Sequence, residues 1–167
     1  DGRRLRRSLT AACQWAREQR SELNRINVFP VPDGDTGTNL ALTVQAITDH
    51  LEKNRDRSVG NVAAEAARAA VLGARGNCGM MLSHFLLGFA RRLEGQDRID
   101  AREFGKAMEA GVQNLYSSLD QAVEGTIVTV MRETADAVSQ TETTDIAPLV
   151  ELMLETAQQS LDRTPDL

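Results

Sequence analysis

Apolar residues recur at spacings of three and four along most of the chain, which is the period of an amphipathic α-helix. This pattern predicts seven helices, over residues 4–20, 38–53, 61–72, 79–93, 101–119, 126–138 and 145–162. The start of the sixth range is rich in β-branched residues and also fits a strand. With no partner strand evident, a helix is predicted there too. The expected fold is all-α, an antiparallel bundle or barrel of about seven to eight helices.

Two of these helices carry apolar stripes that are expected to face the core. In the first helix the stripe consists of Leu5, Leu9, Ala12 and Ala16, with Trp15 beside them. In the last helix it consists of Ile146, Leu149, Val150, Met153, Leu154 and Leu161. Asn61 is expected to cap the Ala-rich third helix.

Composition and charge narrow the class of protein. The chain has 167 residues, which fits one domain, and its net charge of −5 argues against nucleic acid as the main partner. Cys13 and Cys78 are the only cysteines and form no CxxC motif, so neither a zinc site nor a disulfide framework is expected. A location in the reducing cytoplasm is expected instead. No apolar run approaches the length of about 20 residues that a membrane span needs. The two ends read as those of a fragment of a longer protein.

The segment over residues 24–39, NRINVFPVPDGDTGTN, carries the most chemistry. Two prolines stiffen the chain before Asp33 and Asp35, which a tight turn can aim at one hard cation such as magnesium. Thr36, Thr38 and the N–H groups that open the next helix can receive phosphate oxygens. The segment therefore predicts a metal–phosphate site. A simple capping turn is the alternative, whereas a calcium EF-hand fits poorly because its twelfth position holds Val44.

Two further segments interrupt the helical pattern. Residues 73–79, GARGNCG, can cradle an anion with backbone N–H groups, and Arg75 can pair with a phosphate. A tight turn between helices is an equal alternative, since the spacing matches neither GxGxxG nor a P-loop. In residues 124–133, Thr126 can cap a helix and Thr129 can face a polar site. His50 and His84 lie in no recognisable motif.

In this order and spacing, LNRINVFPVPDGDTGTNL, GARGNCGMMLS and VEGTIVTVMRE resemble the DhaL-like (DAK2) kinase family. Within it the chain is most similar to the N-terminal nucleotide-binding domain of the fatty acid kinase A subunits. The resemblance covers nearly the whole chain and implies a single DhaL-like domain over residues 1–167. It implies an antiparallel helical barrel that binds ATP or ADP at one end, where two magnesium ions bridge loop carboxylates to the phosphates.

The resemblance also implies roles for individual residues. Asp33 and Asp35 match metal ligands, and Asn27 is the nearest candidate where dihydroxyacetone kinases carry a third carboxylate. The other matched positions contact nucleotide: Thr36, Gly37, Thr38 and Asn39 beside the phosphates, Gly76, Asn77, Cys78 and Gly79 in a second phosphate loop, and Thr126 and Ile127 at the adenine. Relatives usually carry Ser at the position of Cys78. Arg75 is expected to offset charge in the transition state.

The resemblance implies phosphoryl transfer from ATP to the carboxylate of a fatty acid, giving an acyl phosphate. A DegV-like fatty-acid-binding protein would present the acid, and regions of the longer protein outside this chain would form a homodimer. A carboxylate is already nucleophilic at neutral pH, so no strong general base is needed. Three alternatives stay open: a dihydroxyacetone-type kinase, a nucleotide-sensing regulatory module and a magnesium-dependent phosphatase.

Overall fold

The computed structural model describes residues 1–28 and 32–166. These residues form eight α-helices, one 3-10 turn (Thr164–Asp166) and no strand, which confirms the predicted all-α class. The helices are α1 (Gly2–Glu18), α2 (Arg20–Arg25), α3 (Thr36–Lys53), α4 (Val59–Gly73), α5 (Gly76–Arg92), α6 (Ala101–Ser117), α7 (Ile127–Ser139) and α8 (Ile146–Arg163).

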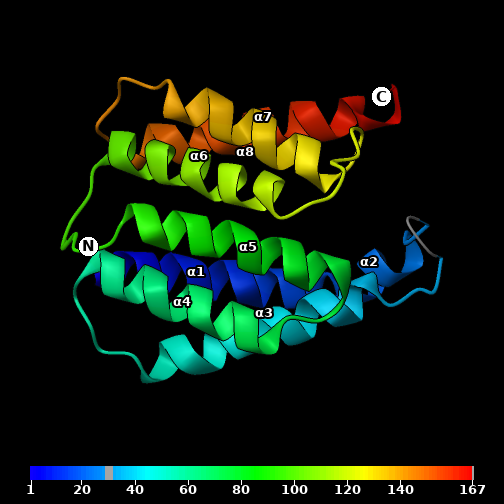
Figure 1. Ribbon diagram of the computed structural model, residues 1–167, viewed down its shortest axis with the longest axis horizontal. Helices are drawn as coiled ribbons and strands as arrows, with labels where there is room; N and C mark the ends of the chain where they lie inside the picture. The colour runs from blue at the N-terminus through cyan, green and yellow to red at the C-terminus, as the bar shows by residue number, and fades with distance from the viewer. Residues whose placement is uncertain (29–31, 167) are drawn as a thin grey trace.

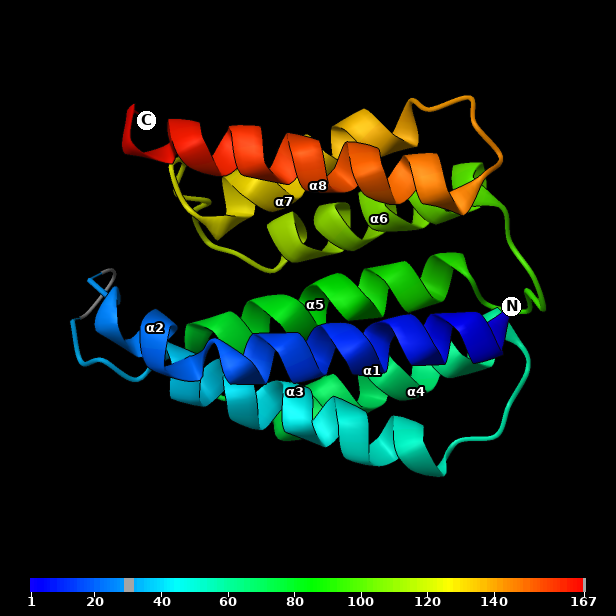
Figure 2. The same cartoon turned by 180° about the vertical axis from the view of Figure 1, so that it is seen from behind.

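The long helices run antiparallel to one another in two groups (Figures 1 and 2). Helices α1 to α5 form one group, and α6, α7 and α8 form the other. Helix α5 packs against α6 and so joins the two groups. This contact is close because Gly88 has no side chain: a Cβ there would lie 2.4 Å from the carbonyl oxygen of Ala110.

The core is built from aliphatic side chains and from the small residues of α4. Ile47, Leu51 and Leu93 are buried, and the alanines of α4 let its neighbours approach closely. Within the described residues, none of the helices combines the length and apolarity that crossing a membrane requires.

The start of the chain differs from its predicted pattern. Helix α1 ends at Glu18, and the separate short helix α2 was not expected. Ala12 and Trp15 are exposed, and Cys13 is buried in their place. The cap of α4 is also corrected: the Ser58 hydroxyl accepts a hydrogen bond from the backbone N–H of Asn61.

Helix α8 buries much less of its apolar stripe than predicted. Leu149 is fully buried and Met153 is partly buried. The other four residues of the stripe are exposed: Ile146, Val150, Leu154 and Leu161. Because α8 packs mainly against α7, only a narrow part of a wide apolar surface is covered.

Candidate functional site

Helices α3, α5 and α7 all begin at the same end of the bundle (Figure 1). The connections that precede them carry the three segments that the sequence singled out. A helix N-terminus presents unpaired N–H groups and a partial positive charge. The first turns of α3 and α5 contain no acidic residue, so this charge is not neutralised within either helix.

The first two predicted segments share one pocket of about 200 Å³. It is lined by seven residues, all of them singled out from the sequence: Asp33, Asp35, Thr36, Asn39, Gly76, Asn77 and Cys78. Residues some 40 positions apart in the chain therefore face one small volume between two helix N-termini.

Asn27 organises the start of α3. Its Oδ1 accepts hydrogen bonds from the backbone N–H of Thr36 at 3.2 Å and from the Thr36 hydroxyl at 2.7 Å. Asp33 accepts a long hydrogen bond of 3.4 Å from the Asp35 N–H. Asp35 is the residue before α3, yet its side chain caps no N–H group of the described residues. The side chain that caps α3 is therefore that of Asn27, and Asp35 lines the pocket. Of the two prolines expected to stiffen this segment, Pro30 lies outside the described residues.

Gly37 and Thr38 lie on the α2 side of α3, away from the pocket. The Thr38 hydroxyl oxygen accepts from Asn24 Nδ2 at 3.0 Å and from Arg20 Nε at 3.2 Å, and the Thr38 N–H donates to Asn24 Oδ1. A Cβ on Gly37 would lie 2.1 Å from the Arg20 carbonyl oxygen. These residues hold α2 against α3, and neither lines the pocket.

The turn before α5 is fixed to α3 through Thr43. The Arg75 N–H donates to the Thr43 hydroxyl oxygen at 3.0 Å, and that hydroxyl donates to the Asn39 carbonyl at 2.9 Å. A Cβ on Gly79 would lie 2.5 Å from Thr43 Oγ1, so the lack of a side chain at Gly79 lets α5 pack closely against α3. Gly76 has φ of +60°, and a Cβ there would lie 2.7 Å from Asn39 Nδ2. Two glycines thus let the turn approach α3 closely enough to form the pocket.

Arg75 does not line the pocket in this arrangement. Its side chain is exposed and donates to the Ala74 carbonyl at 2.8 Å. Cys78 does line it, and its thiol lies 3.6 Å from the Thr36 carbonyl oxygen. Burial raises the pKa of the Cys78 thiol, and the nearby Asp35 carboxylate raises it further. Cys78 therefore offers a protonated thiol at neutral pH.

The pocket suits a magnesium–phosphate group better than a metal held by protein alone. The described residues contain no cluster of three or more His, Cys, Asp or Glu side chains that would hold a metal. Asp33 and Asp35 supply two carboxylates, and magnesium is typically bound by one or two carboxylates with water and substrate phosphates completing its shell. The N-termini of α3 and α5 suit the phosphates.

The third predicted segment lies at the same end but in a separate cavity of about 320 Å³ between α7 and α8. Thr126 caps α7: its hydroxyl oxygen accepts from the Val128 N–H at 3.4 Å and its hydroxyl donates to the Val123 carbonyl at 2.6 Å. Thr126 and Ile127 line the cavity together with Val130, Leu154 and Leu161.

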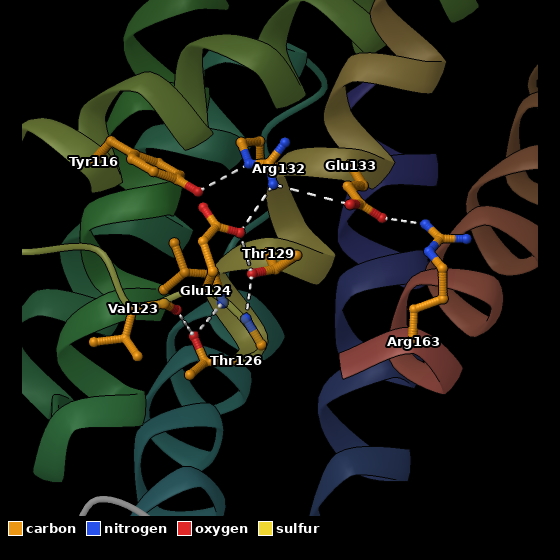
Figure 3. A network of polar contacts seen from close by, with 10 residues as sticks. Tyr116, Val123, Glu124, Thr126, Thr129, Arg132, Glu133 and Arg163 are labelled. Atoms are coloured by element: carbon orange, nitrogen blue, oxygen red, sulfur yellow. Dashed lines mark hydrogen bonds and ion pairs between the residues drawn. The ribbon is translucent and has the colours of Figure 1, made fainter. Parts of the chain in front are cut away.

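Sequence reasoning missed a polar network beside this cavity (Figure 3). Arg132 contacts both Tyr116 and Glu124, and Glu133 pairs with Arg163. The spacing of three between Thr129 and Arg132 places both on one face of a helix, which is the signal available in the sequence. Their partners come from other elements and are not indicated by any local pattern.

Comparison with known proteins gives a family match and several relatives. The family model described as the DAK2 domain matches residues 30–167. An uncharacterized protein of Staphylococcus saprophyticus and the protein YloV of Bacillus subtilis are each 37% identical over all of this chain. An uncharacterized protein of Staphylococcus epidermidis is 38% identical over 87% of it. The chain spans about 31% of the length of the first two relatives and 27% of the third.

Proposed function

Because this chain belongs to the DAK2 domain family, a family of nucleotide-binding, kinase-related modules, we propose that it binds magnesium–ATP, which donates its γ-phosphoryl group to an acceptor and leaves as ADP. The observation that carries the proposal is the pocket in which Asp33 and Asp35 face the N-termini of α3 and α5. Phosphoryl transfer depends mostly on positioning and on neutralising charge, and this pocket has groups for both.

In the proposed complex each group has a separate task. Asp33 and Asp35 hold magnesium, which neutralises charge on the phosphate oxygens. The N–H groups that open α5 at Gly76, Asn77 and Cys78 bind the phosphate chain. The apolar cavity beside Ile127 receives the base, because an aromatic base buries well against aliphatic side chains.

For the acceptor we propose a fatty acid carboxylate presented by a DegV-like partner protein, with acyl phosphate as the product. In support, neither His50 nor His84 lines the pocket, and a carboxylate needs no general base to act as a nucleophile. Homodimerisation through further regions of a longer protein, and a cytoplasmic location, belong to the same proposal.

A non-catalytic nucleotide-binding module is the second candidate. One observation favours it: no Lys or Arg is among the described residues that line the pocket, and Arg75 is turned toward Ala74. Kinases commonly add such a cation to stabilise the transition state.

The donor site is tested by comparing Asp35→Asn with Asp145→Asn. Each aspartate is exposed, directly precedes a helix and caps no N–H group of the described residues. The helices that they precede, α3 and α8, begin at opposite ends of the bundle (Figure 1). In calorimetric titrations with magnesium–ATP, D35N is expected to weaken binding by about tenfold or more, which is about 1.4 kcal/mol. D145N should bind like the unsubstituted chain, and equal binding by both variants would refute the site.

The acceptor is tested with a longer protein that contains this chain, supplied with ATP, magnesium and a fatty-acid-loaded DegV-like protein. Hydroxylamine converts acyl phosphate to a hydroxamate that can be measured. Hydroxamate formation supports the kinase. Its absence, with nucleotide binding intact, favours the regulatory module.

A further inference from the structure

The side chain of Arg132 joins α7 to two preceding elements (Figure 3). Its Nε donates to the Tyr116 hydroxyl oxygen at 3.1 Å, and Tyr116 lies in the last turn of α6. Its Nη2 donates to Glu124 Oε2 at 3.0 Å, and Glu124 lies in the connection between α6 and α7, residues 118–126. One guanidinium therefore links the last turn of α6 to the end of this connection.

Glu124 is held from a second direction by Thr129. The Thr129 hydroxyl donates to Glu124 Oε2 at 2.7 Å and accepts from the Gly125 N–H at 3.0 Å. Thr129 is only 1% exposed, so its position is set by the packing of α7. Gly125 has φ of +75°, a conformation that other residues rarely adopt. The Glu124–Gly125 backbone is thus fixed in one turn.

This turn leads directly into α7, whose first residue is Ile127. Thr126 and Ile127 follow Gly125 directly, and both line the apolar cavity between α7 and α8. Ile127 is 55% exposed although it is a large apolar residue. Exposed apolar side chains beside a cavity are typical of a ligand-binding surface.

We infer that Arg132 is a positioning residue for nucleotide-base recognition: through Glu124 and Tyr116 it holds the turn that presents Ile127 to the base. The inference rests on the proposed function, because it assigns the Ile127 cavity to the base and the pocket at Asp33 and Asp35 to the phosphates. Arg132 lines neither of these two cavities. Its loss therefore affects the base and leaves the phosphates unchanged.

The test compares magnesium–ATP with magnesium–tripolyphosphate, which has the phosphates but no base. The variants are Arg132→Gln and the control Arg92→Gln. Arg92 pairs with Glu103 between α5 and α6 at 2.7 Å, and its side chain is 35% exposed against 36% for Arg132. It lies at the C-terminal end of α5, away from the site. The control therefore removes a similar ion pair between elements without altering the turn.

We expect R132Q to weaken ATP binding by about tenfold, the effect of losing one charged hydrogen-bonding anchor, and to leave tripolyphosphate binding within about twofold. R92Q should change neither affinity. Tyr116→Phe, which removes one oxygen from the network, should weaken ATP binding in the same selective way but by less. If R132Q unfolds the chain, Y116F provides the test.

Two results overturn the inference alone. The first is an unchanged ratio of ATP affinity to tripolyphosphate affinity in R132Q, or in Y116F if R132Q does not fold. The second is equal affinity of the unsubstituted chain for the two ligands. Failure of the unsubstituted chain to bind either ligand with magnesium overturns the proposed function itself. The two failures are therefore distinguishable.

Discussion

Asn27 and Thr36 are joined by two hydrogen bonds to a single oxygen, from the Thr36 N–H at 3.2 Å and from its hydroxyl at 2.7 Å. The bonds satisfy an N–H group at the start of α3 that would otherwise need a partner. They also anchor the connection before α3, which contains Asp33 and Asp35. The amide of Asn27 therefore shapes the site whether or not it also contacts a metal.

Replacing Asn27 tests this anchoring. Asn27→Ala should lower the free energy of unfolding by about 1 kcal/mol, the usual cost of losing a helix cap. Asn27→Asp keeps the acceptor oxygen and places a negative charge near a helix N-terminus, so it should be within about 0.5 kcal/mol of the unsubstituted chain. Urea denaturation measures both. Equal stability of N27A and the unsubstituted chain would contradict the anchoring.

The close approach of α5 to α3 depends on Gly79. Gly79→Ala places a Cβ 2.5 Å from Thr43 Oγ1, the atom that binds the Arg75 N–H. We expect a loss of about 1–3 kcal/mol in stability, because the overpacked helices must move apart. Asn77→Ala, at an exposed position of the same turn, should stay within about 0.5 kcal/mol. A neutral G79A variant would show that the turn is less tightly packed.

Cys78 gives a chemical probe of the pocket. Burial raises the pKa of its thiol above the ordinary value, so at a given pH less of it is the reactive thiolate. Alkylation by iodoacetamide should be slow at pH 7 and should accelerate as the pH rises through and beyond the ordinary thiol range.

Magnesium–ATP should protect Cys78 from this alkylation, because the thiol lines the proposed phosphate pocket. Cys13 is buried in the core and serves as the internal control, with no change on adding nucleotide. Mass spectrometry distinguishes the two sites. Labelling of Cys78 at the same rate with saturating nucleotide would place the nucleotide elsewhere.

Leu149 and Leu154 form a matched pair on α8. Leu149 is 0% exposed and Leu154 is 73% exposed. Leu149→Ala should cost about 2–5 kcal/mol, whereas Leu154→Ala should cost less than about 0.5 kcal/mol. Thermal or urea unfolding checks both. Similar losses would show that Leu154 is covered in solution.

Helical periodicity predicts the fold well where an apolar stripe is long and continuous. It misses α2 because Arg20–Arg25 has six residues, mostly polar, and is held in place by Gly37 and Thr38 rather than by a stripe of its own. It also overestimates the buried face of α8. Periodicity identifies an apolar surface but not how much of it a neighbouring helix covers.

In the candidate site, too, local sequence features are predictable and contacts between separate elements are not. Asp33, Asp35 and the glycines before α5 stand out locally, since carboxylates and glycines in tight turns are typical of phosphate and metal chemistry. The different tasks of Asn39 and Thr38 depend on which side of α3 each residue occupies, and only the packed structure gives that. The contacts of Arg132 with Tyr116 and Glu124 join separate elements and have no local pattern.

Binding of magnesium–phosphate in the pocket between α3 and α5 is tested by calorimetric titration of the unsubstituted chain with ATP. The titration is run with magnesium and again with a chelator. We expect one site per chain and a loss of affinity of about tenfold or more without magnesium, which is about 1.4 kcal/mol. Equal affinity under the two conditions, or no binding under either, would contradict it.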